Sequence, residues 1–162
     1  MVGTSDEPML FSPYLSTTRG MVITVLYRLD GSPDISGLDI PFDDVAENTW
    51  YTDAVKWGAQ YDIILGYGNG NYGPQDYVTR EQLAAIINRY ELFSDKIPPN
   101  ILADSEYSDQ DVIRDYAKTP VNELTMQGLI QGRPGNLFAP RAHATRAELA
   151  AVLHRFLLAL EQ

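Results

Sequence analysis

The chain has 162 residues, of which 44% are hydrophobic and 21% charged, so it is a globular chain with enough apolar residues for a core. Its formal net charge of −10 excludes a general binder of nucleic-acid phosphates, because such a binder needs clustered lysine and arginine. The absence of cysteine excludes disulfides and thiolate metal sites, and no apolar run reaches the roughly 20 residues of a membrane span.

The first predicted element is a helix over 19–29, which begins at the pair Thr18-Arg19. Its apolar residues recur at i, i+3, i+4 and i+7, which is one face of an α-helix. Threonine suits the N-cap, where its hydroxyl accepts a hydrogen bond from a free backbone N–H. Arginine in the first turn opposes the helix dipole, which favours acids there. The arginine therefore has a role other than helix formation.

The same Thr-Arg pattern returns at Thr79-Arg80 and at Thr145-Arg146, and it predicts two further helices. An aromatic residue and a proline precede each pair in the same register, as FSP, YGP and FAP. Gln82 and Glu148 stand three residues after their threonines and complete a capping box. Agreement over three copies indicates a repeat array and an all-α fold.

In the second and third copies another helix precedes the loop. The sequence predicts it over 51–65 and over 119–130, where Thr119 and Pro120 suit the N-cap and first helical positions. Gly66 and Gly132 are expected to end these helices as C′ glycines. The segments PFDDV (41–45) and YSDQDV (107–112), each an aromatic followed by acids, stand further upstream.

The repeat unit divides the chain into three copies: a C-terminal half copy over 1–30 (copy 1), and full copies over 41–92 (copy 2) and 106–160 (copy 3). Linkers rich in Pro, Asp and Ser join them. Gly3 takes the place of Gly66 and Gly132 in copy 1. The chain thus begins in mid-repeat and has no signal peptide, as expected of a fragment. The missing helix predicts an uncovered apolar side on copy 1, where we expect fraying or a homodimer.

The motifs ATRAEL and VTREQL, together with the aromatic-acid segments and the GYGNGNYGP loop, resemble the S-layer homology domain. The resemblance covers nearly the whole chain as two full copies and one half copy, although TTRGMV departs from the motif at Gly20 and Met21. It implies helix–loop–helix repeats packed as a pseudo-threefold helical bundle. It also implies an extracellular, non-catalytic cell-surface module that anchors a larger protein to the cell wall.

The resemblance further implies that grooves between adjacent copies hold an acidic secondary cell-wall polysaccharide, commonly one with a pyruvyl ketal. Arg80 and Arg146 would contact its carboxylate, and Arg19 is the third candidate. The other positions that match the family near the grooves are Thr79, Thr145, Trp50, Asp44, Gly66 and Gly132.

Physical chemistry supports an anion site at these positions. A helix N-terminus offers free N–H groups, and an arginine there adds a planar fork that can hold a carboxylate in bidentate fashion. The alternative is that each arginine pairs with an acid of a neighbouring copy, such as Asp43, Asp44 or Asp109. The two interpretations are compatible, because an acid of a neighbouring copy can orient the arginine that binds the ligand. Trp50 and Tyr116 have two interpretations as well, as platforms for a sugar ring or as fillers of a junction between copies.

The remaining sequence features indicate no further functional site. Trp57 is expected in the core, and Arg28, Arg89 and Arg155 on a solvated or salt-bridged face. The glycine-rich loop lacks the Gly-Lys-Ser/Thr of a phosphate loop, and His143 and His154 lack a third metal ligand. No nucleophile–base set is present, so we expect no catalysis and no cofactor. The rival functions are a protein–protein module for surface-layer assembly and a fragment of a wall hydrolase.

Overall fold

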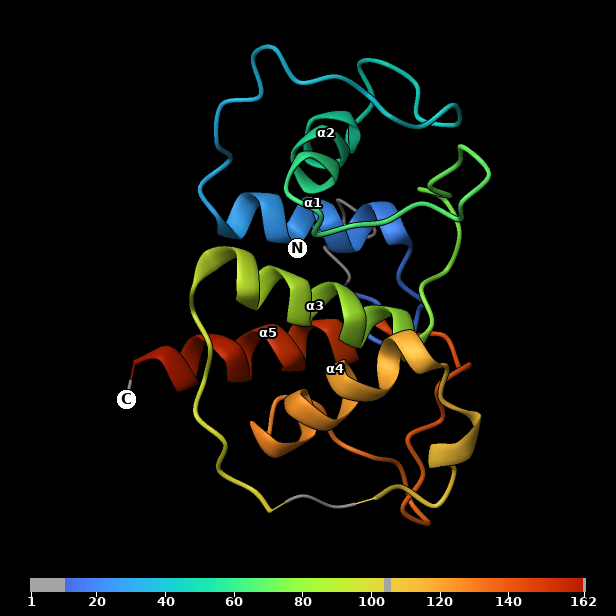
Figure 1. Cartoon of the computed structure of the whole chain (residues 1–162), viewed down its shortest axis with the longest axis vertical. Coiled ribbons are helices and arrows are strands. Elements are labelled where there is room, and N and C mark those ends of the chain that lie inside the picture. Colours follow the sequence, from blue (N-terminus) through green and yellow to red (C-terminus); the bar gives the residue numbers. More distant parts are fainter. Residues whose placement is uncertain (1–10, 104–105, 162) are drawn as a thin grey trace.

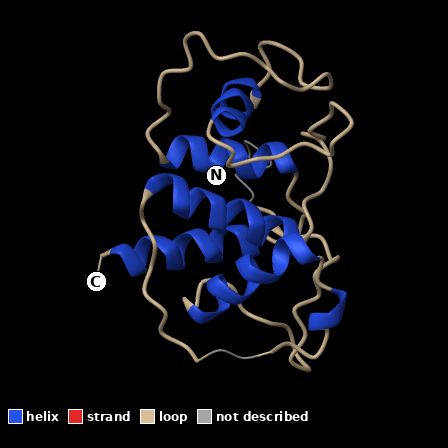
Figure 2. Cartoon of the chain, viewed as in Figure 1, coloured by secondary structure: helices blue, strands red, loops and turns tan. Residues whose placement is uncertain are grey.

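The computed structural model of the chain describes residues 11–103 and 106–161. Its helices in chain order are α1 Arg19–Leu29, α2 Thr52–Gln60, α3 Arg80–Ser94, the 3-10 turn η1 Gln110–Val112, α4 Asp115–Met126 and α5 Arg146–Leu160. The described residues form no strand, so the predicted all-α class is confirmed (Figure 2). Within those ranges no helix is long and apolar enough to cross a membrane. The role predicted for Gly3 lies outside the described residues.

The three Thr-Arg helices begin where the sequence predicts. Each starts at its arginine, and the preceding threonine accepts a hydrogen bond from the backbone N–H three residues on. The side chains of Gln82 and Glu148 each accept a hydrogen bond from the N–H of the capping threonine, which completes both capping boxes. In copy 1 the Thr18 hydroxyl accepts from the Met21 N–H, so the cap holds without the box.

A closed ring of backbone hydrogen bonds joins the residues that precede the three capping threonines. The N–H of Thr17 donates to the Ala144 carbonyl at 2.8 Å, and the N–H of Ala144 donates to the Val78 carbonyl at 2.9 Å. The N–H of Val78 then donates to the Thr17 carbonyl at 2.9 Å. All three residues are buried. The ring relates the three copies by a pseudo-threefold axis and ties the start of the chain to its last helix.

Helices pack between copies rather than within them. α1 of copy 1 lies against α2 of copy 2, and α3 of copy 2 lies against α4 of copy 3 (Figure 1). Val22, Ile23 and Leu26 are fully buried on α1, and Trp57 is in the core as expected. Leucines 157, 158 and 160 on α5 remain partly exposed. Copy 1 also exposes large apolar side chains, namely Phe11, Tyr14 and Leu15, and the homodimer predicted through copy 1 stays a prediction.

The predicted start of the second helix in copy 3 is wrong by about one turn. α4 begins at Asp115, and Pro120 lies inside it rather than at its first position. The buried residues Ala117, Val121 and Leu124 recur at helical spacing, so the apolar face extends upstream of the proline. The start is also held from outside, because the Arg114 N–H donates to the Glu81 carboxylate at 3.1 Å.

Candidate functional site: the grooves between repeats

The Thr-Arg arginines join adjacent copies. Arg19 donates from Nε to the Tyr72 carbonyl at 2.7 Å and from Nη2 to the Leu65 carbonyl at 2.8 Å. Arg80 repeats this with the Phe138 carbonyl at 2.7 Å and the Gln131 carbonyl at 2.8 Å.

The third arginine, Arg146, joins copy 3 to copy 1. Arg146 donates from Nε to the Phe11 carbonyl at 2.9 Å, back into copy 1. Each guanidinium also lies over the ring of the aromatic residue that it bonds, at 4.5 to 5.2 Å. All three arginines are at most 5% exposed. The motif arginine is therefore a buried joint between repeats.

The aromatic-acid segments hold the loops that receive these arginines. Asp44 accepts from the N–H groups of Tyr72 and Gly73 at 2.8 and 2.7 Å. Asp109 accepts from Phe138 and Ala139, both at 2.7 Å. Two of the acids predicted as partners of the arginines, Asp44 and Asp109, thus bind backbone instead. For Arg80 the carboxylate partner is Glu148, at 2.6 Å.

Gly66 and Gly132 do not end the helices that precede them. α2 ends at Gln60 and α4 at Met126, and it is Gly128, with φ +72°, that follows the end of α4. A Cβ on Gly66 would lie 2.7 Å from Cε1 of Phe42, and one on Gly132 would lie 2.6 Å from Cε1 of Tyr107. Glycine is needed at both positions because the ring of the aromatic-acid segment packs on the loop.

We expect Gly66→Ala to lower the free energy of unfolding by roughly 1–3 kcal/mol, the cost of overpacking. The added methyl would also meet the Asn71 carbonyl at 2.7 Å, and backbone cannot move aside cheaply. Urea unfolding measures the change. Gly68→Asn is the control, because nothing lies within 4 Å of a Cβ there and asparagine tolerates its φ of +83°. Equal losses in the two variants would contradict the packing role.

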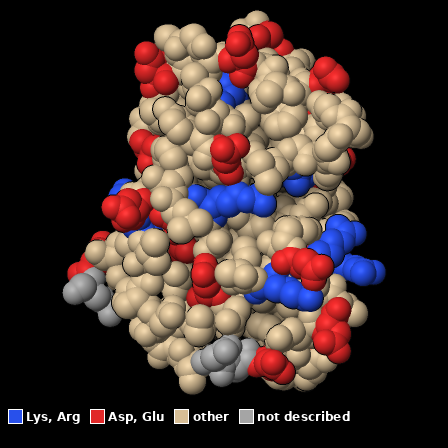
Figure 3. All heavy atoms as spheres, in the orientation of Figure 1, with Lys and Arg blue, Asp and Glu red and all other residues tan. Residues whose placement is uncertain are grey.

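Groove A is the hollow between copies 1, 2 and 3, with a volume of about 290 Å³. It is lined by Arg19, Leu65, Gly66, Tyr67, Gln82, Ala85, Ile86, Arg89, Arg114 and Tyr116. None of these lining residues is acidic. Basic side chains gather over the seam where α1 meets α3 and beside the start of α4 (Figure 3).

Two arginines of groove A keep unused donors. Arg19 Nη1 has no hydrogen-bond partner among the described residues, although the other two nitrogens of its guanidinium are bonded. Arg89 is half-buried and, within the described chain, has no hydrogen bond or ion pair. Burial lowers the pKa of Arg89, and the positive charge of Arg19 lowers it further. Only Arg114 has an acidic partner there, since its Nε lies 3.7 Å from the buried Glu81 carboxylate.

Groove B is the equivalent hollow one repeat on, with a volume of about 310 Å³. It is lined by Arg80, Ile130, Gln131, Gly132, Arg133, Ala147, Glu148, Ala151, Val152 and Arg155. Glu148 binds Arg80 at 2.6 Å and Arg133 at 3.1 Å. Although burial raises the pKa of Glu148, the Thr145 N–H and the charges of Arg80 and Arg133 hold it below its ordinary value.

The remaining predicted residues divide between cap, loop and surface. Thr79 and Thr145 serve as N-caps. Trp50 is 52% exposed with its ring edge-on to Tyr51, and it is not among the lining residues of either groove. Its counterpart Tyr116 does line groove A. Arg89, which the sequence analysis expects on a solvated or salt-bridged face with Arg28 and Arg155, is half-buried and lines groove A. Its repeated position was the signal that could have placed it in the site.

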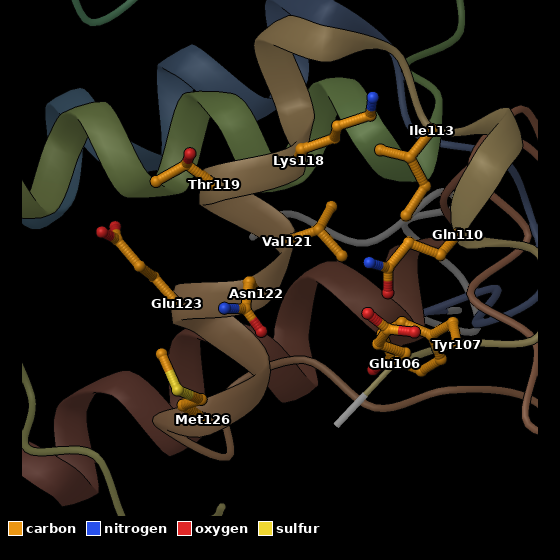
Figure 4. A pocket seen from close by; sticks show the side chains of 10 residues that line it. All are labelled: Glu106, Tyr107, Gln110, Ile113, Lys118, Thr119, Val121, Asn122, Glu123 and Met126. Carbon is orange, nitrogen blue, oxygen red and sulfur yellow. The ribbon is translucent and has the colours of Figure 1, made fainter. Parts of the chain in front are cut away.

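A third hollow, of about 350 Å³, lies along α4 (Figure 4). Its lining contains the acids Glu106 and Glu123, and its one lysine, Lys118, is paired with Asp115 at 2.7 Å. These charges disfavour an anionic ligand. Elsewhere in the described ranges, no three His, Cys, Asp or Glu residues are grouped to hold a metal ion.

Comparison with known proteins places the chain in a family. The model of the S-layer homology domain matches residues 41–84 and 106–150, together more than half of the chain. An amylopullulanase of Thermoanaerobacterium thermosulfurigenes is 35% identical over 150 residues, which are 91% of this chain and 8% of that protein. The exoglucanase XynX of Acetivibrio thermocellus is 39% identical over 148 residues, 91% of this chain and 13% of the relative.

A cellulosome-anchoring protein of Acetivibrio thermocellus is 26% identical over 151 residues, which cover 91% of this chain and 33% of the relative. The chain therefore spans at most a third of the length of these three relatives. Both matched segments contain the Thr-Arg motif and the loop that receives an arginine from the preceding copy. The chain belongs to the S-layer homology domain family.

Proposed function

We propose that the chain anchors a larger protein to the bacterial cell wall by holding an acidic wall polysaccharide in the grooves between its repeats. Family membership supports the coarser part, a cell-surface anchoring module. Groove A supports the binding of an acidic polysaccharide, because three arginines and two tyrosines line it and none of its lining residues is acidic. The module acts by binding outside the cell, and catalysis belongs to other parts of such proteins.

The lining of groove A suits an acidic sugar. A guanidinium binds a carboxylate through two parallel hydrogen bonds, and Arg89 has its donors available. The rings of Tyr67 and Tyr116 offer apolar faces to the C–H face of a pyranose. The net charge of −10 opposes an anionic polymer at long range, but the Debye length of about 8 Å at physiological salt leaves the local arginines dominant.

The carboxylate is expected on a pyruvyl ketal, as the family resemblance implies. Ligand contact by Arg80 and Arg146 stays a prediction. Arg80 lines groove B, but Nε, Nη1 and Nη2 of its guanidinium are all bonded inside the protein. A variant that removes Arg80 would therefore alter the fold together with the groove, so the binding test has to use other arginines.

The test is sedimentation of the purified chain with bacterial walls that retain or lack their secondary polymer. We expect the wild type to sediment only with walls that retain the polymer. The double variant Arg89→Gln with Arg155→Gln removes one arginine from each groove, and we expect its binding to fall about tenfold or more, as loss of a charge-assisted contact would cause. Both arginines are partly exposed, so the fold should persist.

The matched control is Lys56→Gln with Lys118→Gln, which makes the same change in net charge outside both grooves. This control should bind as the wild type does. Equal loss in both double variants would indicate general charge attraction, and loss in the control alone would favour the hollow along α4. Binding that survives removal of the polymer would favour a protein partner in surface-layer assembly.

A further inference from the structure

We propose that groove A receives the carboxylate of the ligand and groove B does not, and that residue 82 decides between them. This inference rests on the proposed function and names the part of the site that selects an anion. It follows from the pseudo-threefold repeat, which places different residues at equivalent points of two otherwise similar grooves.

Three of the positions at which the two grooves differ bear on the hydrogen bonds of Arg19, Arg89 and their counterparts. Gln82 of groove A corresponds to Glu148 of groove B, since each is the third residue after a capping threonine. Leu65 corresponds to Gln131, because Arg19 bonds the carbonyl of the first and Arg80 that of the second. Two residues further on, Tyr67 corresponds to Arg133.

In groove B these residues satisfy the arginines internally. Glu148 Oε1 accepts hydrogen bonds from Arg80 Nη1 and from Arg133 Nη2. Arg155 donates to the Leu129 carbonyl at 3.0 Å and to Gln131 Oε1 at 3.2 Å. A carboxylate entering groove B would have to displace Glu148 and would meet its negative charge, which disfavours a second anion.

In groove A the same donors stay unsatisfied. Gln82 is neutral, so Arg19 Nη1 lacks the carboxylate that its counterpart Arg80 Nη1 has. Leucine at position 65 has no side-chain acceptor for Arg89. Asp62 acts on Arg89 only from outside the lining. A ligand carboxylate can therefore bind Arg19 Nη1 as Glu148 binds Arg80 Nη1, in a groove that the unpaired Arg89 also lines. The Arg19 side chain that would hold it is built into the fold, since Arg19 is 4% exposed.

Exchanging the two residues tests this and keeps both helix starts, because glutamine and glutamate both complete a capping box. The probe is methyl 4,6-O-(1-carboxyethylidene)-β-D-glucopyranoside, with its methyl ester as the uncharged control. NMR spectra of the arginine Nε–H groups follow binding in each groove. In the wild type we expect the acid to shift the signals of Arg19 and Arg89 but not those of Arg80 and Arg155, and the ester to shift neither set.

Gln82→Glu should weaken binding of the acid about tenfold or more while the melting temperature stays equal or rises, because the new carboxylate would pair with Arg19. If residue 82 had only a structural role, Gln82→Glu would weaken binding and lower the melting temperature together. Glu148→Gln should add a shift at Arg80, since it removes the carboxylate that binds Arg80 Nη1. Unchanged binding in Gln82→Glu, equal shifts in both grooves of the wild type, or no shift at all would overturn the inference.

The two proposals can fail separately. Probe binding in groove A without any sedimentation on polymer-bearing walls would overturn wall anchoring and support the carboxylate site. Sedimentation that needs the polymer, combined with equal shifts in both grooves, would support anchoring and overturn the selection by residue 82.

Discussion

Arg80→Met should lower the free energy of unfolding by about 3–5 kcal/mol, the usual cost of breaking a buried ion pair by removing one partner. The methionine keeps much of the side-chain volume and loses every donor. The Phe138 and Gln131 carbonyls and Glu148 would each lose a hydrogen bond from a charged group. For a protein of this size each kcal/mol lowers Tm by roughly 2–4 °C, so calorimetry should show a fall of about 10 °C or more.

Arg133→Met is the matched control, because Arg133 pairs with the same Glu148 carboxylate at 3.1 Å but is 39% exposed. An exposed pair contributes about 0–1 kcal/mol. Its loss should therefore change Tm by only a few degrees. If both variants unfold alike, the joint between copies 2 and 3 does not depend on the buried arginine.

The local parts of this fold could be predicted from the sequence. Helix starts at Arg19, Arg80 and Arg146 follow from a threonine cap and an apolar period, which act within a few residues. The start of α4 could not, because it depends on Glu81 of another copy, which binds the Arg114 N–H. Pro120 is a strong local signal for a first helical position, and tertiary packing overrides it.

The chemistry of the grooves required the structure for the same reason. Whether an arginine is satisfied depends on carbonyls such as Leu65 and Tyr72, which lie about fifty residues away in the chain. The sequence ranks Arg80 above Arg19 because its motif is better preserved. The structure leaves a free donor on Arg19 instead, since Glu148 of the next motif binds Arg80 Nη1, whereas the residue at that position in groove A is the neutral Gln82.

The contact between α3 and α4 contains a buried acid, Glu91, whose side chain is fully inaccessible. Gln127 Nε2 donates to its Oε2 at 3.5 Å, whereas Glu91 Oε1 and Gln127 Oε1 both lack a partner in the described chain. Protonation of Glu91 would remove the buried charge and turn one of its oxygens into a donor. Burial chiefly raises the pKa of Glu91 to about 7, Gln127 and Asn88 lower it, and the charge of Glu123 raises it.

Glu91→Gln should therefore stabilise the protein at pH 8 and change little at pH 5. The folded pKa of about 7 lies above the ordinary value of 4.5, so the folded state binds the proton more tightly. The stability linked to this proton is complete below about pH 4.5 and is lost as pH rises through about 7. A neutral amide avoids that loss, which is on the order of 3 kcal/mol. Urea unfolding at pH 5, 6, 7 and 8 measures the difference from the wild type.

Only that difference isolates Glu91, because a chain with a net charge of −10 also gains self-repulsion as its other acids ionise. The exposed Glu106 gives the control: Glu106→Gln removes the same charge from solvent and should shift stability by less than about 0.5 kcal/mol at every pH. A Glu91→Gln gain that is equal at pH 5 and pH 8 would mean that Glu91 is already ionised in the folded protein at pH 5. The α3–α4 contact would then hold a buried carboxylate at pH 5, and not a protonated Glu91.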